Sequence, residues 1–315
     1  MDLIGIGEIL IDFTPTVTAE GRFFKQNAGG APCNMLTMAQ ILGTATAFIG
    51  KAGEDQFGHF LKQTLKDHGV GTQGFILSPE YPTTLAFVHL EDSGERDFSF
   101  YRRGCADVML TEAEVDPALI AGAKALHFGS LSFTHEPSRS AVLKAVHLAR
   151  EKGLLVTYDP NYRPPLWASE AEAVAGMRLG LALADVVKVS EEEALLLTGQ
   201  TDLEAAGEAL RALGIRLVTI TLGEQGSFFS HSAGSGIVPG FRAAVADTTG
   251  AGDAFFGSLV HQLLDSGKPL EALTAEELRG YLRFSNAVAS LCIESLGGIP
   301  SLPDRERVEA RLQEQ

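Results

Sequence analysis

The chain has 315 residues, of which 45% are hydrophobic and 21% are charged, and this is an ordinary composition for a soluble globular protein. It carries 40 acidic side chains against 25 Lys and Arg, a formal net charge of −15. This acidic balance argues against a general nucleic-acid-binding protein and against a polybasic membrane anchor, because both need clustered cations.

The cysteines and the apolar segments indicate the compartment. Cys33, Cys105 and Cys292 are far apart and form no Cys-x-x-Cys pair, so the sequence predicts neither a disulfide framework nor a zinc site. The segment 1–10 has no basic residues before its apolar run and does not resemble a secretory signal. The later apolar stretch 179–187 is too short to span a bilayer. We therefore expect a cytoplasmic protein.

Short apolar runs alternate with helical patterns along the chain. Segments 53–68 and 137–152 repeat apolar residues at helical spacing, and a glycine follows each of them. This alternation predicts an α/β fold in one domain over residues 1–315, with a mostly parallel sheet covered by helices on both faces. Continuous apolar runs, typical of strands buried on both faces, lie at 3–7, 45–49, 125–128, 154–158, 186–189 and 217–221.

Two regions interrupt this alternation. Residues 9–26 mix polar and apolar side chains directly after the first predicted strand. Residues 83–105 contain a hairpin pattern, with a turn at Asp92–Ser93–Gly94 and strict alternation over 97–101. We predict that both regions form extra strands outside the main sheet, as a small lid. The charged tail, 304–315, predicts a solvated helix.

The strongest candidate site is the segment Asp247-Thr-Thr-Gly-Ala-Gly-Asp253, which is followed directly by an apolar helical pattern. The free N–H groups and the dipole of a helix N-terminus bind anions, and Gly250 and Gly252 let the backbone approach a phosphate closely. Bound phosphates would repel the Asp253 carboxylate, so a chemical role is one reading of this residue. The other reading is an ordinary helix cap or first-turn acid.

Four other polar clusters precede helices or follow predicted strands. Gly29-Gly30-Ala-Pro-Cys-Asn34 leads into a helix and leaves room for a small ligand. Asp159-Pro-Asn-Tyr-Arg163, Lys188-Val-Ser190-Glu-Glu-Glu193 and Thr221-Leu-Gly223-Glu-Gln-Gly226 follow strands, where ligands of open α/β sheets bind. Each cluster also has a structural alternative, as a turn, a helix cap or a complement to the helix dipole. No GxxxxGK[ST] phosphate loop occurs.

Together these segments resemble the ribokinase/fructokinase family of carbohydrate kinases. The segment GGAPCN with residues 50–58 is similar to the N-terminal signature of the family, and DTTGAGDAFFGSLV is similar to its C-terminal signature. The similar motifs extend from Gly5 to Pro303. The resemblance implies a ribokinase-like three-layer α/β/α domain with a β-stranded lid, ATP as phosphoryl donor and Mg²⁺ as the required metal.

The resemblance also assigns roles to single residues. It makes Asp253 the catalytic base, with an anion hole formed by Gly250, Ala251 and Gly252. It implies a sugar site formed by Asp12, Gly29, Gly30, Asn34, Tyr101, Arg103 and Arg163. It implies a nucleotide site formed by Lys188, Ser190, Thr221, Gly223, Gly226 and Asn286.

Two metal sites follow from the same resemblance. Glu193 matches the acid of an Asn-x-x-Glu motif that acts on Mg²⁺ through water, although Ser190 stands here in place of the Asn. Asp247 and Thr249, with the 297–298 loop, match a site for a monovalent cation such as K⁺.

The acceptor sugar is indicated by fewer residues. Segments 99–110, 127–133 and 159–167 resemble bacterial and plant fructokinases, which implies that D-fructose is converted to fructose 6-phosphate. A 2-keto-3-deoxygluconate kinase of the same family is the alternative, because it has a similar Tyr-Arg pair in the lid.

Two readings from other classes stay open. One is a non-catalytic sugar- or nucleotide-binding protein on the same fold. The other is a dinucleotide-dependent oxidoreductase, suggested by Gly5-x-Gly7. The third glycine of its fingerprint is missing, since Leu10 occupies that position.

The expected partners are a sugar and ATP, with no nucleic acid and no membrane. Apolar lid residues (Phe87, Phe98 and Phe100) are spaced to pair across a two-fold axis, so we also predict a homodimer through the lid.

Overall fold

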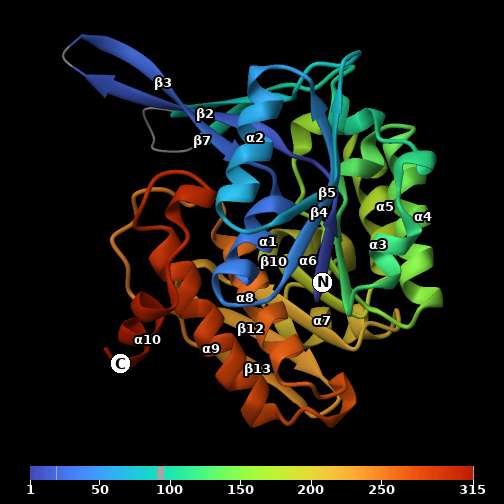
Figure 1. Cartoon of the computed structure of the whole chain (residues 1–315). Coiled ribbons are helices and arrows are strands. Elements are labelled where there is room, and N and C mark those ends of the chain that lie inside the picture. The colour runs from blue at the N-terminus through green and yellow to red at the C-terminus, as the bar shows by residue number, and fades with distance from the viewer. Residues whose placement is uncertain (19, 91–95, 315) are drawn as a thin grey trace.

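The computed structural model describes residues 1–18, 20–90 and 96–314, and in these residues the central sheet has nine strands (Figure 1). Their order is β13-β12-β11-β10-β9-β8-β1-β4-β5, and only the pairs that involve β12 are antiparallel. The predicted mostly parallel sheet is therefore confirmed. The strands are β1 (Leu3–Ile6), β4 (Thr46–Gly53), β5 (Gly71–Ser78), β8 (Ala125–Gly129), β9 (Leu155–Asp159), β10 (Val186–Ser190), β11 (Leu217–Thr221), β12 (Ser227–His231) and β13 (Gly234–Val238).

Helices cover both faces of this sheet, which gives three layers (Figure 1). One face carries α1 (Ala31–Ile41), α2 (Gln56–Asp67), α8 (Ala251–Asp265) and α9 (Ala275–Cys292), with α10 (Arg305–Gln313) packed on α9. The other face carries α3 (Pro117–Ala121), α4 (Ser138–Glu151), α5 (Glu170–Leu181), α6 (Glu191–Thr198) and α7 (Leu203–Arg211). Short 3₁₀ turns are η1 (Ala106–Met109), η2 (Glu112–Glu114), η3 (Leu131–Thr134), η4 (Pro164–Leu166), η5 (Gly223–Gln225), η6 (Leu270–Ala272) and η7 (Ile299–Ser301).

The hydrophobic pattern explains this layering. Every residue of β1 and β4 is buried, as expected for strands with helices on both sides. The predicted helix 137–152 is confirmed as α4, which buries the apolar stripe that includes Val142, Ala145 and Val146. The predicted helix 53–68 is α2, which begins only at Gln56 because the Asp55 side chain accepts a hydrogen bond from the Gly58 N–H and caps the helix.

The lid is a second sheet outside the core. In the described residues it has four strands in the order β3-β2-β6-β7: β2 (Leu10–Thr18), β3 (Gly21–Gly29), β6 (Leu85–Leu90) and β7 (Arg96–Tyr101). The β2–β3 hairpin extends well beyond the body of the molecule (Figure 1). Strand β3 continues to Gly29, so the first lid segment is longer than the predicted 9–26. The predicted turn Asp92–Ser93–Gly94 lies outside the described residues.

Aromatic side chains form a cluster on the lid. Phe87 stacks on Phe13 with ring centroids 4.8 Å apart, and the rings of Phe24 and Tyr101 meet Phe87 edge-on at 5.4 and 5.6 Å. Phe87 is thereby half-buried, and the side chain of Phe98 lies outside the described part. Among the lid residues whose side chains are described, the exposed aromatic ones are Phe23, Phe24 and Tyr101.

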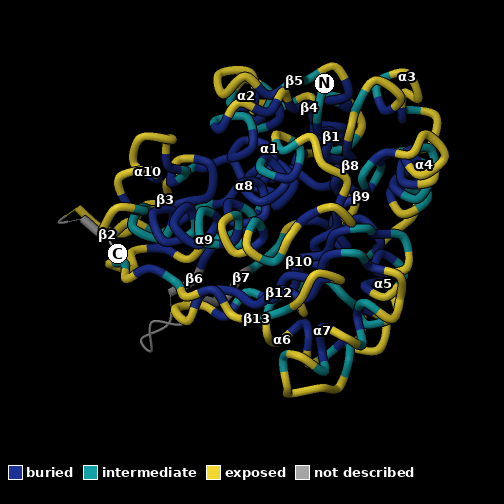
Figure 2. Tube along the Cα trace, turned by 90° about the horizontal axis from the view of Figure 1, so that it is seen from below, coloured by how far each residue is buried: buried dark blue, intermediate teal, exposed yellow. Residues whose placement is uncertain are grey.

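Figure 2 shows that exposed positions gather on the outer helices and the lid, whereas the inner strands of the central sheet are buried. The edge strands β5 and β13 are only partly buried. The three cysteines are buried and free. None of the helices in the described part of the chain has the length and apolarity that a bilayer span requires.

Candidate active site

A cavity of about 460 Å³ lies between the lid, the carboxyl ends of β9 and β10 and the N-terminus of α8, and its size suits a small ligand. Many residues that the sequence pointed to line it: Asp12, Gly30, Asn34, Arg163, Lys188, Ser190, Glu193, Thr249, Gly250, Gly252 and Asp253. In the described structure its wall does not include Gly29, Tyr101, Arg103, Thr221, Gly223, Gly226, Asp247, Ala251 or Asn286.

The first turn of α8 is shaped to receive an anion. Gly250 is the N-cap residue with φ 80°, a left-handed conformation that glycine adopts without strain, and it supplies no side-chain cap. A methyl group on Gly252 would come within 2.8 Å of Lys188 Nζ, so this ammonium group lies directly against the turn. Uncapped N–H groups and a cation thus meet at one place, and this arrangement fits a phosphate.

Asp253 lies in this first turn and is available for proton transfer. Asn34 Nδ2 donates a hydrogen bond to Asp253 Oδ2 at 2.8 Å, which holds the carboxylate toward the cavity. Removal from water, and then the nearby Asp159 carboxylate, raise the pKa of Asp253 to about 6, although Asn34 and Lys188 oppose the rise. A carboxylate with this pKa is ionised at neutral pH and is still a competent proton acceptor.

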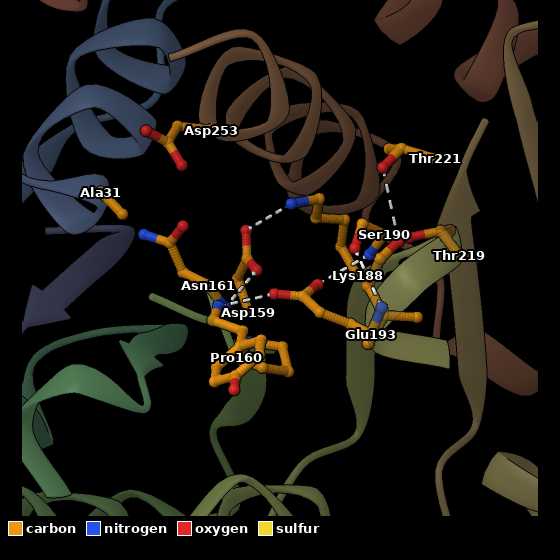
Figure 3. Close-up of polar contacts among 12 residues, drawn as sticks. Ala31, Asp159, Pro160, Asn161, Lys188, Ser190, Glu193, Thr219, Thr221 and Asp253 are labelled. Carbon is orange, nitrogen blue, oxygen red and sulfur yellow. Dashed lines mark hydrogen bonds and ion pairs between the residues drawn. The ribbon is translucent and has the colours of Figure 1, made fainter. Parts of the chain in front are cut away.

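Asp159 forms a buried ion pair with Lys188 across the neighbouring ends of β9 and β10. Lys188 Nζ lies 2.9 Å from Asp159 Oδ2, and the Asn161 N–H donates to the other oxygen at 3.0 Å (Figure 3). Burial alone would lower the pKa of Lys188, but Asp159 and Glu193 outweigh it and raise this pKa. The sequence placed Asp159 in a polar cluster without a role of its own. The available signal was that Asp159 and Lys188 each lie at the end of a predicted apolar strand.

Glu193 joins the start of α6 to the loop after β9. Its Oε2 accepts the Ser190 N–H at 2.7 Å, and Ser190 Oγ accepts the Glu193 N–H at 3.1 Å, which is a capping box. Its Oε1 accepts the Tyr162 N–H at 2.6 Å (Figure 3). In the described residues no group of three or more His, Cys, Asp and Glu side chains is arranged to hold a metal ion.

The opposite wall carries a second carboxylate, Asp12. Its side chain lies against Gly29, where a Cβ atom would overlap it, so Gly29 shapes the site from behind. Burial raises the pKa of Asp12 to about 7, which Arg163 opposes and Asp253 reinforces. Asp12 and Arg163 thus offer an acceptor and a donor in the same cavity.

Glu8 also lines this cavity, and the sequence analysis missed it. Its Oε1 accepts the Ala31 N–H at 3.3 Å, while its Oε2 is buried without a partner in the described structure. Burial raises the pKa of Glu8 to about 7. Gly30 is confined beside it, because a Cβ atom there would lie 2.6 Å from the Glu8 carbonyl oxygen. An acid inside the apolar run 3–11 was the signal that the sequence offered.

Three residues assigned to the nucleotide site, Thr221, Gly226 and Asn286, lie outside this cavity, where they contact or confine neighbouring backbone segments. Gly226 has φ 100°, and a Cβ atom there would overlap the Val238 carbonyl oxygen. Asn286 Nδ2 donates to the carbonyl oxygens of Val238 at 2.9 Å and Pro239 at 3.1 Å, so α9 fixes the segment after β13. Thr221 Oγ1 donates to the Val189 carbonyl at 3.4 Å (Figure 3).

Asp247 connects the anion-binding turn to the 297–298 loop. It is buried, and its two oxygens accept the N–H groups of Thr249 at 2.7 Å and Gly297 at 2.9 Å. The segments assigned to a monovalent cation are therefore adjacent.

The two lid residues assigned to the sugar, Tyr101 and Arg103, do not line the cavity that contains Asp253. The resemblance assigns both Arg103 and Arg163 to the sugar, but Arg163 lines this cavity whereas Arg103 lines a neighbouring one. Tyr101 is 63% exposed on the outside of the lid. Sugar contacts from Tyr101 and Arg103 stay predictions.

Comparison with known proteins agrees with this geometry. The sequence profile of the pfkB family carbohydrate kinases matches residues 2–305. Fructokinase-2 of Oryza sativa subsp. japonica is 43% identical over 306 residues, which are 96% of this chain and 90% of that protein. The fructokinase of Xylella fastidiosa with bound ATP is 33% identical with a TM-score of 0.91, and the match covers 99% of this chain and 98% of that one.

A third relative is the fructokinase of Vibrio cholerae O395. Its structure with fructose, ADP and a calcium ion is 32% identical with a TM-score of 0.90, over 99% of both chains. A double mutant of the same enzyme binds fructose, ADP and a potassium ion, and it superposes with a TM-score of 0.89 at 31% identity over 99% of this chain and 98% of that one. The chain therefore belongs to the pfkB family of carbohydrate kinases, enzymes that transfer a phosphoryl group from ATP to a sugar.

Proposed function

We propose that this kinase phosphorylates D-fructose at its terminal hydroxymethyl group and forms fructose 6-phosphate. The observation that carries the proposal is Asp253, held by Asn34 at the uncapped first turn of α8 with Lys188 against the same turn. A base and an anion site thus lie within one turn of helix. Relatives that cover nearly the whole chain are named fructokinases, which supports fructose as the acceptor.

The chemistry follows from these positions. Asp253 accepts the proton of the sugar hydroxyl as that oxygen attacks the γ-phosphoryl group of ATP in line. The transition state is loose, so positioning and charge stabilisation matter more than base strength. The N–H groups of residues 250–252 and the Lys188 ammonium stabilise charge on the transferred group. Closure of the lid over the sugar excludes water and limits ATP hydrolysis.

The sugar-side contacts are proposed for Asp12, Gly30, Asn34 and Arg163. Asp12 and Arg163 supply an acceptor and a forked donor in one cavity, which suits vicinal hydroxyl groups. The adenine end of ATP is proposed to lie along the segments that contain Thr221, Gly223, Gly226 and Asn286. Support comes from their contiguity at the ends of β11 and β13.

Two metal ions complete the proposal. Mg²⁺ bound to ATP would neutralise phosphate charge, with Glu193 acting on it through water. Both Glu193 oxygens already accept backbone N–H groups, which fits an indirect role. K⁺ is proposed near Asp247 and Thr249, where a buried carboxylate adjoins the anion-binding turn. Replacing K⁺ by N-methylglucamine in the assay is expected to lower kcat.

A substrate panel tests the acceptor. Initial rates with fructose, 2-keto-3-deoxygluconate, ribose and adenosine are measured side by side, and the product is identified by ³¹P NMR. We expect fructose to have the highest kcat/KM and fructose 6-phosphate to be the product. A tenfold preference for 2-keto-3-deoxygluconate would replace fructose and keep the family, while no turnover of any sugar would favour a binding protein.

We further propose a homodimer formed through the lid, in a reducing compartment such as the cytoplasm, where the free cysteines are stable. The exposed fractions of Phe23 (49%) and Phe24 (41%) on β3 support an apolar contact there. Sedimentation velocity is expected to show a dimer that dissociates in the double variant Phe23→Ser and Phe24→Ser. Leu213→Ser is the control, because Leu213 is 54% exposed away from the lid.

A further inference from the structure

A second cavity, of about 600 Å³, lies beside the catalytic one. Its wall is formed by the end of β7, by η3, by the start of α4 and by the segment from η4 into α5. Phe100 is the residue that lines both cavities in the described structure. The residues proposed to bind ATP, and Asp253, do not contribute to the second cavity, which is large enough for a small organic ligand.

The charges around this cavity are unlike those of the whole protein. The chain has a net charge of −15, yet the wall carries three arginines and His135 against one acid, Glu172. Arg102 is already used: its Nε lies 2.7 Å from Asp107, and its other nitrogens donate to Thr134 and to the Leu131 carbonyl. This buried guanidinium forms a fixed, satisfied part of the wall.

Two other arginines are free to bind a ligand. In the described part of the chain, the guanidinium groups of Arg103 and Arg139 have no hydrogen-bond or ion-pair partner, and both residues are exposed and line the cavity. His135 also lines this cavity, and burial, then Arg102 and more weakly Arg103, lower its pKa. Unpaired guanidinium groups at one opening are the usual donors to phosphate.

Three aromatic side chains contribute to the rest of the wall. Trp167 packs over Gly176 of α5, where a Cβ atom would overlap the indole ring, and Phe133 and Phe100 complete the apolar surface. Trp167 Nε1 is buried without a hydrogen-bond partner in the described residues. A pocket with aromatic walls and a few convergent donors fits the carbon skeleton of a ligand as well as its charge.

We propose that this second cavity binds a small phosphorylated organic molecule, with Arg103 and Arg139 on the phosphate and Trp167 against the carbon skeleton. This assignment gives Arg103 a role other than the sugar contact expected from the sequence. It concerns a binding site, so it does not depend on which sugar the kinase phosphorylates.

The single tryptophan makes the site directly observable, since Trp167 is the one Trp of the chain and lies in its wall. The full-length protein is saturated with fructose and a non-hydrolysable ATP analogue to fill the catalytic cavity, and fructose 6-phosphate is then added as the probe. We expect a saturable change in Trp fluorescence and one further site per chain by calorimetry.

Matched variants identify the residues. Arg139→Gln is expected to weaken binding of the probe at least about tenfold, because a charge-assisted hydrogen bond is lost. It should leave kcat and the KM for fructose unchanged, since Arg139 lies outside the catalytic cavity. Arg307→Gln on α10 is the control and should have no effect, because Arg307 is exposed and lines neither cavity.

Three outcomes would overturn the proposal. The first is no saturable signal once the catalytic cavity is filled. The second is equal affinity in the wild type and Arg139→Gln. The third is binding of inorganic phosphate as tight as that of fructose 6-phosphate, which would show a simple anion site without recognition of the carbon skeleton.

Discussion

The two cavities are neighbours that share Phe100, but their walls have opposite character. The catalytic cavity gathers carboxylates, among them the buried Glu8 and Asp12 and the half-buried Asp253, around the two cations Lys188 and Arg163. The second cavity gathers guanidinium groups and aromatic rings. Two surfaces separated by one side chain are thus suited to different ligands.

Burial of the carboxyl groups explains which ligands the catalytic cavity favours. Carboxylates withdrawn from water hold their protons more tightly, and the pKa of Asp12 and Glu8 rises to about 7. Near neutral pH such a group is present in both forms. The protonated form can donate a hydrogen bond to a neutral hydroxyl group, whereas the ionised form accepts one and repels anions. Phosphate therefore fits the catalytic cavity best at the α8 turn, where N–H groups and Lys188 offset the carboxylates.

The largest expected effect comes from Asp253→Asn. The change keeps the size and hydrogen-bonding shape of the side chain and removes its charge and its ability to accept a proton. We expect kcat to fall at least about 100-fold, with an unchanged melting temperature and equal or tighter ATP binding, because a repulsive charge is lost. Gly250 is the N-cap of α8, so the remaining structural alternative for Asp253 is an acid of the first helical turn. In that case Asn would cost little, and near-normal turnover would remove Asp253 from the mechanism.

The pH profile is the next test of the acidic cavity. The pKa of Asp253 is raised to about 6, so the base is ionised above this pH and becomes protonated below it. We expect kcat/KM to fall toward tenfold per pH unit as the pH drops below about 6. ATP also ionises in this range, so Asp253→Asn is measured in parallel. The residual kcat/KM of this variant should lack the part of the fall below pH 6 that is due to Asp253. An identical profile for both proteins would contradict the assignment.

A smaller effect distinguishes the two cavities through their arginines. Arg163→Ala is expected to raise the KM for fructose about tenfold with little change in the KM for ATP, because a charged donor to the sugar is lost. Arg103→Ala should leave the fructose KM within about twofold, since Arg103 lines the other cavity. An equal increase in the KM for fructose in both variants would show that Arg103 also binds the sugar, and the two arginines would then not distinguish the cavities.

The sequence predicted the parts of this molecule that depend on local pattern. Apolar runs and glycine-terminated helices predicted the parallel core, and the glycines before α8 predicted an anion site. The edge strands β5 and β13 were missed, because Gly71, Gln73 and Gly234 interrupt the apolar pattern in strands that are only partly buried. Edge strands need less apolar surface, so their sequence signal is weaker.

The site was predicted less completely than the fold. Asp253, Asn34 and Arg163 were identified because each lies in a short motif whose own residues are close together in sequence. The pairing of Asp159 with Lys188 depends on which strands are adjacent, and a pattern along one strand does not contain it. The position of Arg103 depends on how the lid strand β7 ends against η4, which is again a tertiary property.

The smallest expected effect concerns the stability of the acidic wall. Burial raises the pKa of Glu8 from an ordinary value of 4.5 to about 7. A carboxyl group with a raised pKa in the folded state favours folding at low pH, and this contribution is lost as the pH rises through about 7. The cost at pH 8 is at most about 3 kcal/mol, since one pKa unit corresponds to 1.36 kcal/mol.

Glu8→Gln removes this charge and keeps an oxygen that can accept the Ala31 N–H. We therefore expect the melting temperature of the variant, relative to wild type, to be a few degrees higher at pH 8 than at pH 5. Glu306→Gln, on the exposed face of α10, is the control and should show no such pH-dependent difference. If Glu8→Gln lowers the melting temperature equally at both pH values, the Glu8 charge is compensated within the cavity. The wall would then be less acidic than its composition indicates, and its contrast with the second cavity would weaken.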